Sequence, residues 1–92
     1  MMTINPTHSV ADVATDVIEN CSRKKASELL SDLYERQVIY MVEAVVAGDN
    51  KAIIEHAKNI ASLETLSKAH DIRREMHVER LKTMPYRADI CK

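Results

Sequence analysis

The scarcity of glycine and proline is the sequence feature that most restricts the fold of this chain. Gly48 is the only glycine among 92 residues, and the two prolines, Pro6 and Pro85, lie near the ends. So few turn-forming residues disfavour β architectures, which need many tight turns. The chain also lacks Phe and Trp, so aliphatic, Ala and Met side chains must form its core. We therefore expect an all-α protein whose clearest internal turn is at Gly48.

A short amphipathic helix is expected first, after a flexible N-terminus at residues 1–8. Ser9 and Asp12 have the spacing of a helix-capping pair. Behind them, apolar residues fall within an arc of about 140° at helical spacing. These residues are Val10, Val13, Ala14, Val17, Ile18 and Cys21. Because Cys21 lies on this stripe, we expect it to be a small core side chain rather than a reactive thiol.

A second and longer helix is expected over about residues 26–47. It follows the polar run 22–25, which either breaks the helical pattern or forms an exposed turn of it. Within 38–47 only Glu43 is charged, which indicates burial nearly all round. The frequent β-branched residues there also allow a strand, but continuity with the helical pattern upstream favours a helix. One neighbouring helix could not cover such a segment, so it predicts a bundle or an oligomer.

The sequence Gly48-Asp49-Asn50 predicts the end of one helix and the cap of the next. So short a connection makes the flanking helices antiparallel neighbours. From residue 51 to Met84 the chain has no further Gly or Pro. Its apolar pattern changes phase, so this helix either kinks or restarts near 62–67, or it changes partner. We favour one continuous helix that changes partner.

The predicted fold is thus a short N-terminal helix followed by a long antiparallel helical hairpin, assembling as a dimeric helical bundle. The helical domain spans residues 9–84, and residues 85–92 form a C-terminal tail. The aliphatic residues beside the turn predict the contact between copies. The candidate self-association residues are Val38, Tyr40, Val42, Val45, Val46, Ile53 and Ile60.

A separate heptad-like row in the last helix predicts a surface for another protein, which would dock as a helix in a groove. The candidate partner-binding residues are Leu63, Leu66, His70, Arg73, Arg74, His77, Leu81 and Met84. Two histidines of this row, His70 and His77, also suggest a pH switch. The simpler interpretation is that both imidazole rings lie at a solvent-exposed edge of the helix, beside the neighbouring arginines.

Charge is balanced overall, with a net charge of −1, but it is unevenly distributed. Residues 1–22 carry three acidic residues and no Lys or Arg, whereas residues 68–92 carry seven basic residues against four acidic ones. Oppositely charged ends can attract a second copy, although two solvated faces are the simpler interpretation. A nucleic-acid-binding regulator using the basic C-terminal helix is the alternative function. Binding to nucleic acid would need a positively charged face, and Asp71, Glu75 and Glu79 lie between the basic residues and reduce that charge.

Catalytic and metal-binding patterns find little support. His56, His70 and His77 are fourteen and seven residues apart, whereas two ligands on one helix need a spacing of three or four. No nucleophile stands in a glycine-flanked turn, and one glycine cannot build a phosphate-binding loop. We therefore expect no enzymatic activity, no cofactor and no metal.

The two cysteines, Cys21 and Cys91, form neither a close pair nor a metal-binding motif, and no signal-peptide pattern precedes them. No apolar stretch is long enough to span a bilayer, so we expect a reduced, cytoplasmic protein. The sequence as a whole predicts a non-enzymatic protein–protein interaction module, such as an adaptor, chaperone or inhibitor, that acts as a helical homo-oligomer.

Overall fold

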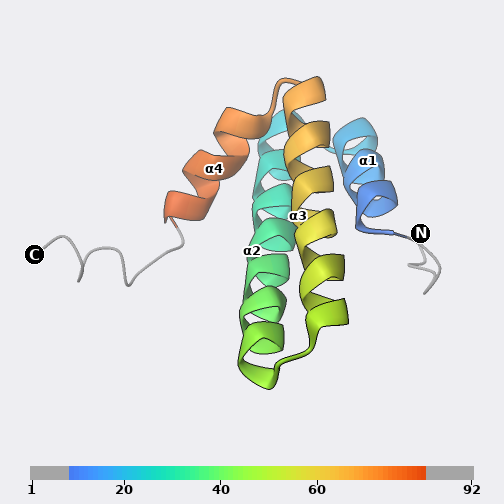
Figure 1. Ribbon diagram of the computed structural model, residues 1–92. Coiled ribbons are helices and arrows are strands. Elements are labelled where there is room, and N and C mark those ends of the chain that lie inside the picture. Colours follow the sequence, from blue (N-terminus) through green and yellow to red (C-terminus); the bar gives the residue numbers. More distant parts are fainter. Residues whose placement is uncertain (1–8, 83–92) are drawn as a thin grey trace, which may run out of the picture.

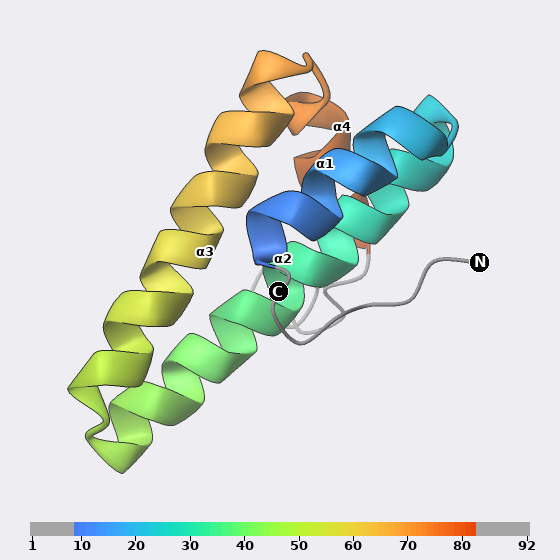
Figure 2. The same cartoon turned by 90° about the vertical axis from the view of Figure 1, so that its right-hand side faces the viewer.

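The computed structural model describes residues 9–82, and this part of the chain contains four helices and no strand. They are α1 (Val10–Asn20), α2 (Arg23–Ala47), α3 (Asn50–Ala69) and α4 (Arg73–Lys82). Helices α2 and α3 lie side by side and run in opposite directions (Figure 1). Helices α1 and α4 pack on opposite faces of this pair, at the end remote from Gly48 (Figure 2). The predicted all-α class is confirmed.

Several expectations concern segments at the chain ends. The predicted N-terminus (1–8), the tail (85–92) and Met84 lie outside the described residues. Among residues 9–82, no helix combines the length and the apolar character needed to cross a membrane.

The starts of α1 and α2 are fixed by serine caps. The Ser9 hydroxyl accepts a hydrogen bond from the Asp12 amide (3.2 Å), and the Asp12 carboxylate accepts one from the Ser9 amide (3.4 Å), so the predicted capping pair is confirmed. Cys21 is extended, and Ser22 then caps α2 by accepting a hydrogen bond from the Lys25 amide (3.3 Å). The polar run 22–25 is thus a break followed by the first turn of a new helix.

Gly48 ends α2 as its position in the sequence predicts. It adopts a left-handed conformation with φ of 72°. Its amide donates to the Val45 carbonyl (3.1 Å), and the Asp49 amide donates to the Ala44 carbonyl (2.9 Å). This bonding pattern is a Schellman motif, which satisfies carbonyls that the end of a helix leaves without a partner. Asp49 then caps α3 by accepting from the Ala52 amide (3.1 Å).

The expectation of one continuous helix from residue 51 to Met84 is wrong, and the helix does not restart at 62–67 either, because α3 runs unbroken through these residues. Helix α3 ends at Ala69 and α4 begins at Arg73. Asp71 lies between them with φ of 57°, and its amide donates to the Lys68 carbonyl (3.1 Å). The Ile72 amide donates to the Ser67 carbonyl (2.8 Å). This is a second Schellman motif, with aspartate at the left-handed position where glycine is usual.

Substitutions at Asp71 should measure the free energy that its left-handed backbone conformation costs. Asp71→Gly should unfold at the same or a slightly higher urea concentration, because glycine adopts positive φ without steric cost but loses more entropy on folding. Asp71→Val should lose about 1–2 kcal/mol, because a β-branched side chain is strained at positive φ. Urea titrations followed by circular dichroism give the order. A valine variant as stable as the glycine variant would contradict a strained turn.

The core lies where all four helices meet. Its buried apolar residues are Ala14, Val17, Ala26, Leu30, Leu63, Ile72 and Met76. Leu63 and Met76 are fully buried, and the break after α3 is what turns Ile72 and Met76 back onto the other helices. The stripe predicted for the first helix is confirmed, because its remaining members, Cys21 included, pack partly buried against this core.

Candidate interaction surface

The half of the α2–α3 pair next to Gly48 is covered by neither α1 nor α4 (Figure 1). We call residues 38–60 the distal half. Ala44 is its only buried residue. Six large apolar side chains of the distal half are exposed, and we call them the distal surface: Ile39, Tyr40, Val42, Val45, Val46 and Ile54. Val46 is 84% exposed and the other five are 45–58% exposed, which is high for large apolar side chains of one short stretch of structure.

The uncovered face continues the face on which α4 packs. On α2, α4 contacts Glu35 through Arg80 (3.2 Å), and Val38, Val42 and Val45 follow Glu35 at spacings of three, four and three. On α3, α4 contacts Glu64 through His77 (2.6 Å). Ile60, Ala57 and Ile53 precede Glu64 at spacings of four, three and four. Such spacings keep residues on one side of a helix. The two helices therefore form one apolar face, of which α4 covers only the part farther from Gly48.

A polar cluster fixes α2 against α3 where the distal half begins. Gln37 is only 7% exposed, and its side-chain oxygen accepts hydrogen bonds from His56 Nδ1 (2.7 Å) and Asn59 Nδ2 (3.1 Å). The Tyr40 ring packs against the His56 ring with centroids 5.4 Å apart. Because buried polar groups must find specific partners, this cluster specifies how the two helices align. The distal surface is therefore held on a defined helix pair.

The predicted self-association residues gather in the distal half. Tyr40, Val42, Val45 and Val46 belong to the distal surface. The other three, Val38, Ile53 and Ile60, are partly buried. Ile39 and Ile54 belong to the same surface but are not among the predicted residues, although both lie within the aliphatic clusters that flank Gly48.

The predicted partner-binding row is not one surface, because the helix break divides it. Leu63 is fully buried in the core and Leu66 packs against the core, so the expectation that they form an open apolar row is wrong. His70 and Arg74 are exposed, near the connection between α3 and α4. Leu81 is exposed on α4, and Met84 lies outside the described residues.

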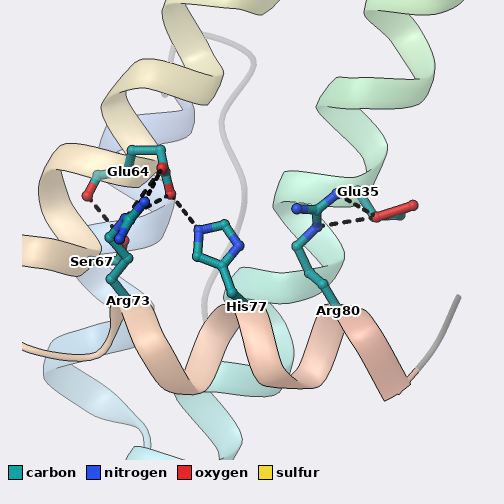
Figure 3. Close-up of polar contacts among 6 residues, drawn as sticks. All are labelled: Glu35, Glu64, Ser67, Arg73, His77 and Arg80. Carbon is teal, nitrogen blue, oxygen red and sulfur yellow. Dashed lines mark hydrogen bonds and ion pairs between the residues drawn. The ribbon is translucent and has the colours of Figure 1, made fainter.

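Arg73 and His77, two further members of that row, are engaged by Glu64 (Figure 3). The Glu64 carboxylate accepts hydrogen bonds from Arg73 Nη2 (3.1 Å) and Arg73 Nε (3.2 Å), and from His77 Nε2 (2.6 Å). The His77 ring meets the Tyr34 ring edge-on at 5.3 Å, and the Arg80 guanidinium lies 4.2 Å above the Tyr34 ring. These contacts attach α4 to both α2 and α3.

The cluster also shifts two pKa values. Burial by itself raises the pKa of Glu64, but the hydrogen bonds from Arg73 and His77, together with their charges, outweigh it and lower this pKa below its ordinary value. Burial, and then the Glu64 carboxylate, raise the pKa of Tyr34 despite the nearby Arg80 and Arg73. Both shifts follow from packing α4 against its neighbours. We therefore interpret the cluster around Glu64 as a structural contact that holds α4 on its neighbours.

In the part of the chain that the structure describes, no group of three or more His, Cys, Asp or Glu side chains is placed so that it could hold a metal ion. The strongest candidate site among the described residues is the distal surface, because its large apolar side chains are exposed. Comparison of the chain with protein-family models, with curated proteins and with solved structures finds no match.

Proposed function

We propose that this protein is a non-enzymatic protein–protein interaction module that acts as a helical homodimer through its distal surface. The observation that carries the proposal is the unequal burial along the α2–α3 pair. At one end four helices bury a common core, whereas the distal half exposes six large apolar side chains. Large exposed apolar side chains in such number mark interaction sites on small domains.

The charge pattern favours a second copy as the occupant of this surface. Over residues 38–47 only Glu43 is charged. Two such surfaces can pack together with few like charges brought face to face, as in homodimer interfaces, which are more apolar than other protein contacts. A symmetric dimer also uses one surface twice, so it covers both exposed patches at once. A long antiparallel hairpin would in this way complete a dimeric helical bundle.

The nucleic-acid alternative loses support from the ion pairs of α4. Arg73 pairs with Glu64, Arg80 with Glu35, and Lys82 with Glu79. Arg23, at the start of α2, pairs with Glu75. Binding to phosphates would have to break these pairs or work beside their carboxylates. This alternative would be restored if the protein retarded the migration of short duplex DNA in a gel and if this binding weakened steeply with salt.

Light scattering on a sizing column tests the proposal directly. The chain has a mass of 10.4 kDa, and we expect twice this mass at micromolar concentration. A clean monomer at high micromolar concentration would contradict the proposed self-association.

Val42→Asp should separate the copies without unfolding them. Val42 is 54% exposed in the single chain, so aspartate is solvated in the monomer but buried without a partner in the dimer. Burial of an unpaired carboxylate costs several kcal/mol, which corresponds to at least about a hundredfold weaker association. The measurement is molecular mass against concentration, together with helical content by circular dichroism.

Thr65→Asp is the matched control for Val42→Asp. It adds the same carboxylate at an exposed helical position outside the distal half. Its mass should match that of the unmodified protein. If both variants dissociate equally, added negative charge rather than burial at the distal surface explains the result, and the proposed interface is wrong.

A further inference from the structure

Five aliphatic residues in the second half of α2, four of them exposed, are placed symmetrically along the helix. We call Val38, Ile39, Val42, Val45 and Val46 the α2 stripe. Relative to Val42, the other four lie three and four residues before it and three and four residues after it. At 100° per residue the stripe covers an arc of about 120°, wide enough for one packing face. The same stripe is therefore presented when the helix is turned end over end about Val42.

This symmetry matches a two-fold axis perpendicular to the helix. Such an axis at Val42 places each residue level with the partner's residue at the mirrored position. Val38 then lies level with the partner's Val46, Ile39 with the partner's Val45, and Val42 with its own copy. Side chains at these spacings form the ridges that pack between two helices. Every member of the stripe thus faces an aliphatic residue, as a self-complementary interface requires.

Charges on α2 favour this antiparallel arrangement over a parallel one. In a parallel pair each residue lies level with its own copy, so Glu43 would be level with the partner's Glu43, and Arg36 with the partner's Arg36. In the antiparallel pair about Val42, Glu43 is level with the partner's Met41 and Arg36 with the partner's Gly48. The Glu43–Glu43 and Arg36–Arg36 pairs of the parallel arrangement are then avoided, and the antiparallel alignment of the two helix dipoles is favourable.

The position of α4 is compatible with the same arrangement. Helix α4 lies on the side of α2 that carries the stripe and reaches Glu35 through Arg80 (3.2 Å). Glu35 is seven residues before Val42, so it would be level with the partner's Asp49. The partner's α2 has already ended there, because this helix stops at Ala47. The overlap of the two helices therefore ends where the cover by α4 begins.

We infer that two copies of this protein pack their α2 stripes antiparallel about a two-fold axis at Val42. The inference rests on the proposed function, because it states how the self-association surface is used. Together with α3 of each copy, the two stripes complete a bundle of helices across the distal halves. No charged residue of the stripe is buried, since the stripe contains none.

Disulfide crosslinking tests this arrangement in the full chain. The background carries Cys21→Ala and Cys91→Ser, so that each variant has one cysteine. Val42→Cys should crosslink with its own copy on mild oxidation, because residues at a two-fold axis can approach within the 4.4–6.8 Å between Cα atoms that a disulfide needs. Val46→Cys alone should crosslink roughly tenfold more slowly or not at all, because its copies lie about 12 Å apart along the helix axis.

A mixture of Val38→Cys and Val46→Cys chains is the decisive sample. Fusing the Val46→Cys chain to a larger solubility tag makes the mixed dimer distinguishable on a non-reducing gel. We expect the mixed disulfide and little of either homodimeric disulfide. Light scattering and circular dichroism on the reduced samples confirm that each variant keeps its mass and helicity.

Two outcomes overturn the inference and are distinguishable from failure of the proposed function. Val46→Cys crosslinking with itself as fast as Val42→Cys would indicate a parallel pair. A protein of twice the monomer mass in which no stripe cysteine crosslinks would place the interface elsewhere. In both cases self-association stands. A monomeric unmodified protein would remove the proposed function as well.

Discussion

Leu63→Ala should lower the free energy of unfolding by about 3 kcal/mol, since leucine-to-alanine changes in well-packed cores cost 2–5 kcal/mol. Leu63 is fully buried among residues of all four helices, so its removal leaves a cavity that no single helix can close. A loss of this size is large against the stability of a small domain and should lower the melting temperature by roughly 12–24 °C. Urea titrations and thermal melts at one fixed protein concentration measure it, because association would otherwise shift both.

Leu81→Ala is the matched control, because it makes the same substitution on α4 at a side chain that is 51% exposed. Its cost should stay within about 0.5 kcal/mol, as is usual for surface positions. Equal losses in the two variants would mean that the packing around Leu63 does not hold the four helices together. A reduced urea midpoint for Leu63→Ala alone, with an unchanged dependence on urea, is the expected result.

The sequence predicts the local elements of this fold well, because their signals are local. Ser9 and Asp12 form the capping pair that their spacing indicates. Gly48 ends α2, since it supplies a left-handed residue at no steric cost. The apolar stripe of the first helix packs against the core. Each of these features depends on residues within one or two turns of each other.

The break at Asp71 could not be predicted in the same way. No Gly or Pro marks it, and aspartate occupies a left-handed conformation only when the rest of the protein compensates for the strain. The compensation comes from Ile72 and Met76, which the break places in the core. A straight helix would hold Glu64 and Arg73 about 13 Å apart along its axis, whereas their side chains are in contact. Only the tertiary structure shows that the break brings these two side chains together.

The start of α2 was ambiguous for an electrostatic reason. Arg23, Lys24 and Lys25 form its first turn, where positive charge is unfavourable to the helix dipole. The Ser22 cap and the ion pair between Arg23 and Glu75 (2.8 Å) compensate, and the second of these joins residues from α2 and α4. The candidate interaction surface was easier to anticipate, because the uncharged run 38–47 shows where the apolar residues gather. Which part α4 covers was not visible in the sequence.

Glu64→Gln should destabilise the protein by about 1–2 kcal/mol at pH 7. Hydrogen bonds to charged groups contribute about 1.5–3 kcal/mol, and partial exposure of this cluster reduces that contribution. The variant keeps the size of the side chain but loses the negative charge that faces Arg73 and His77 of α4. Tyr34 of α2 also faces this carboxylate, and its pKa is raised partly by it. Glu55→Gln, at an exposed position of α3, is the control and should change stability by less than about 0.5 kcal/mol.

The pH dependence separates the charge of Glu64 from its packing. Because the pKa of Glu64 is lowered in the folded protein, its stabilising contribution is fully present above the ordinary glutamate pKa, near 4.5. That contribution is lost as pH falls through the folded value, where the carboxylate takes up a proton in both states. The stability difference between the unmodified protein and Glu64→Gln should therefore be large at pH 7 and shrink as the pH is lowered below 4. Urea titrations at matched ionic strength follow this difference, and a gap that stays constant from pH 7 to pH 3 would show that packing, and not the ion pairs that attach α4, is what Glu64 contributes.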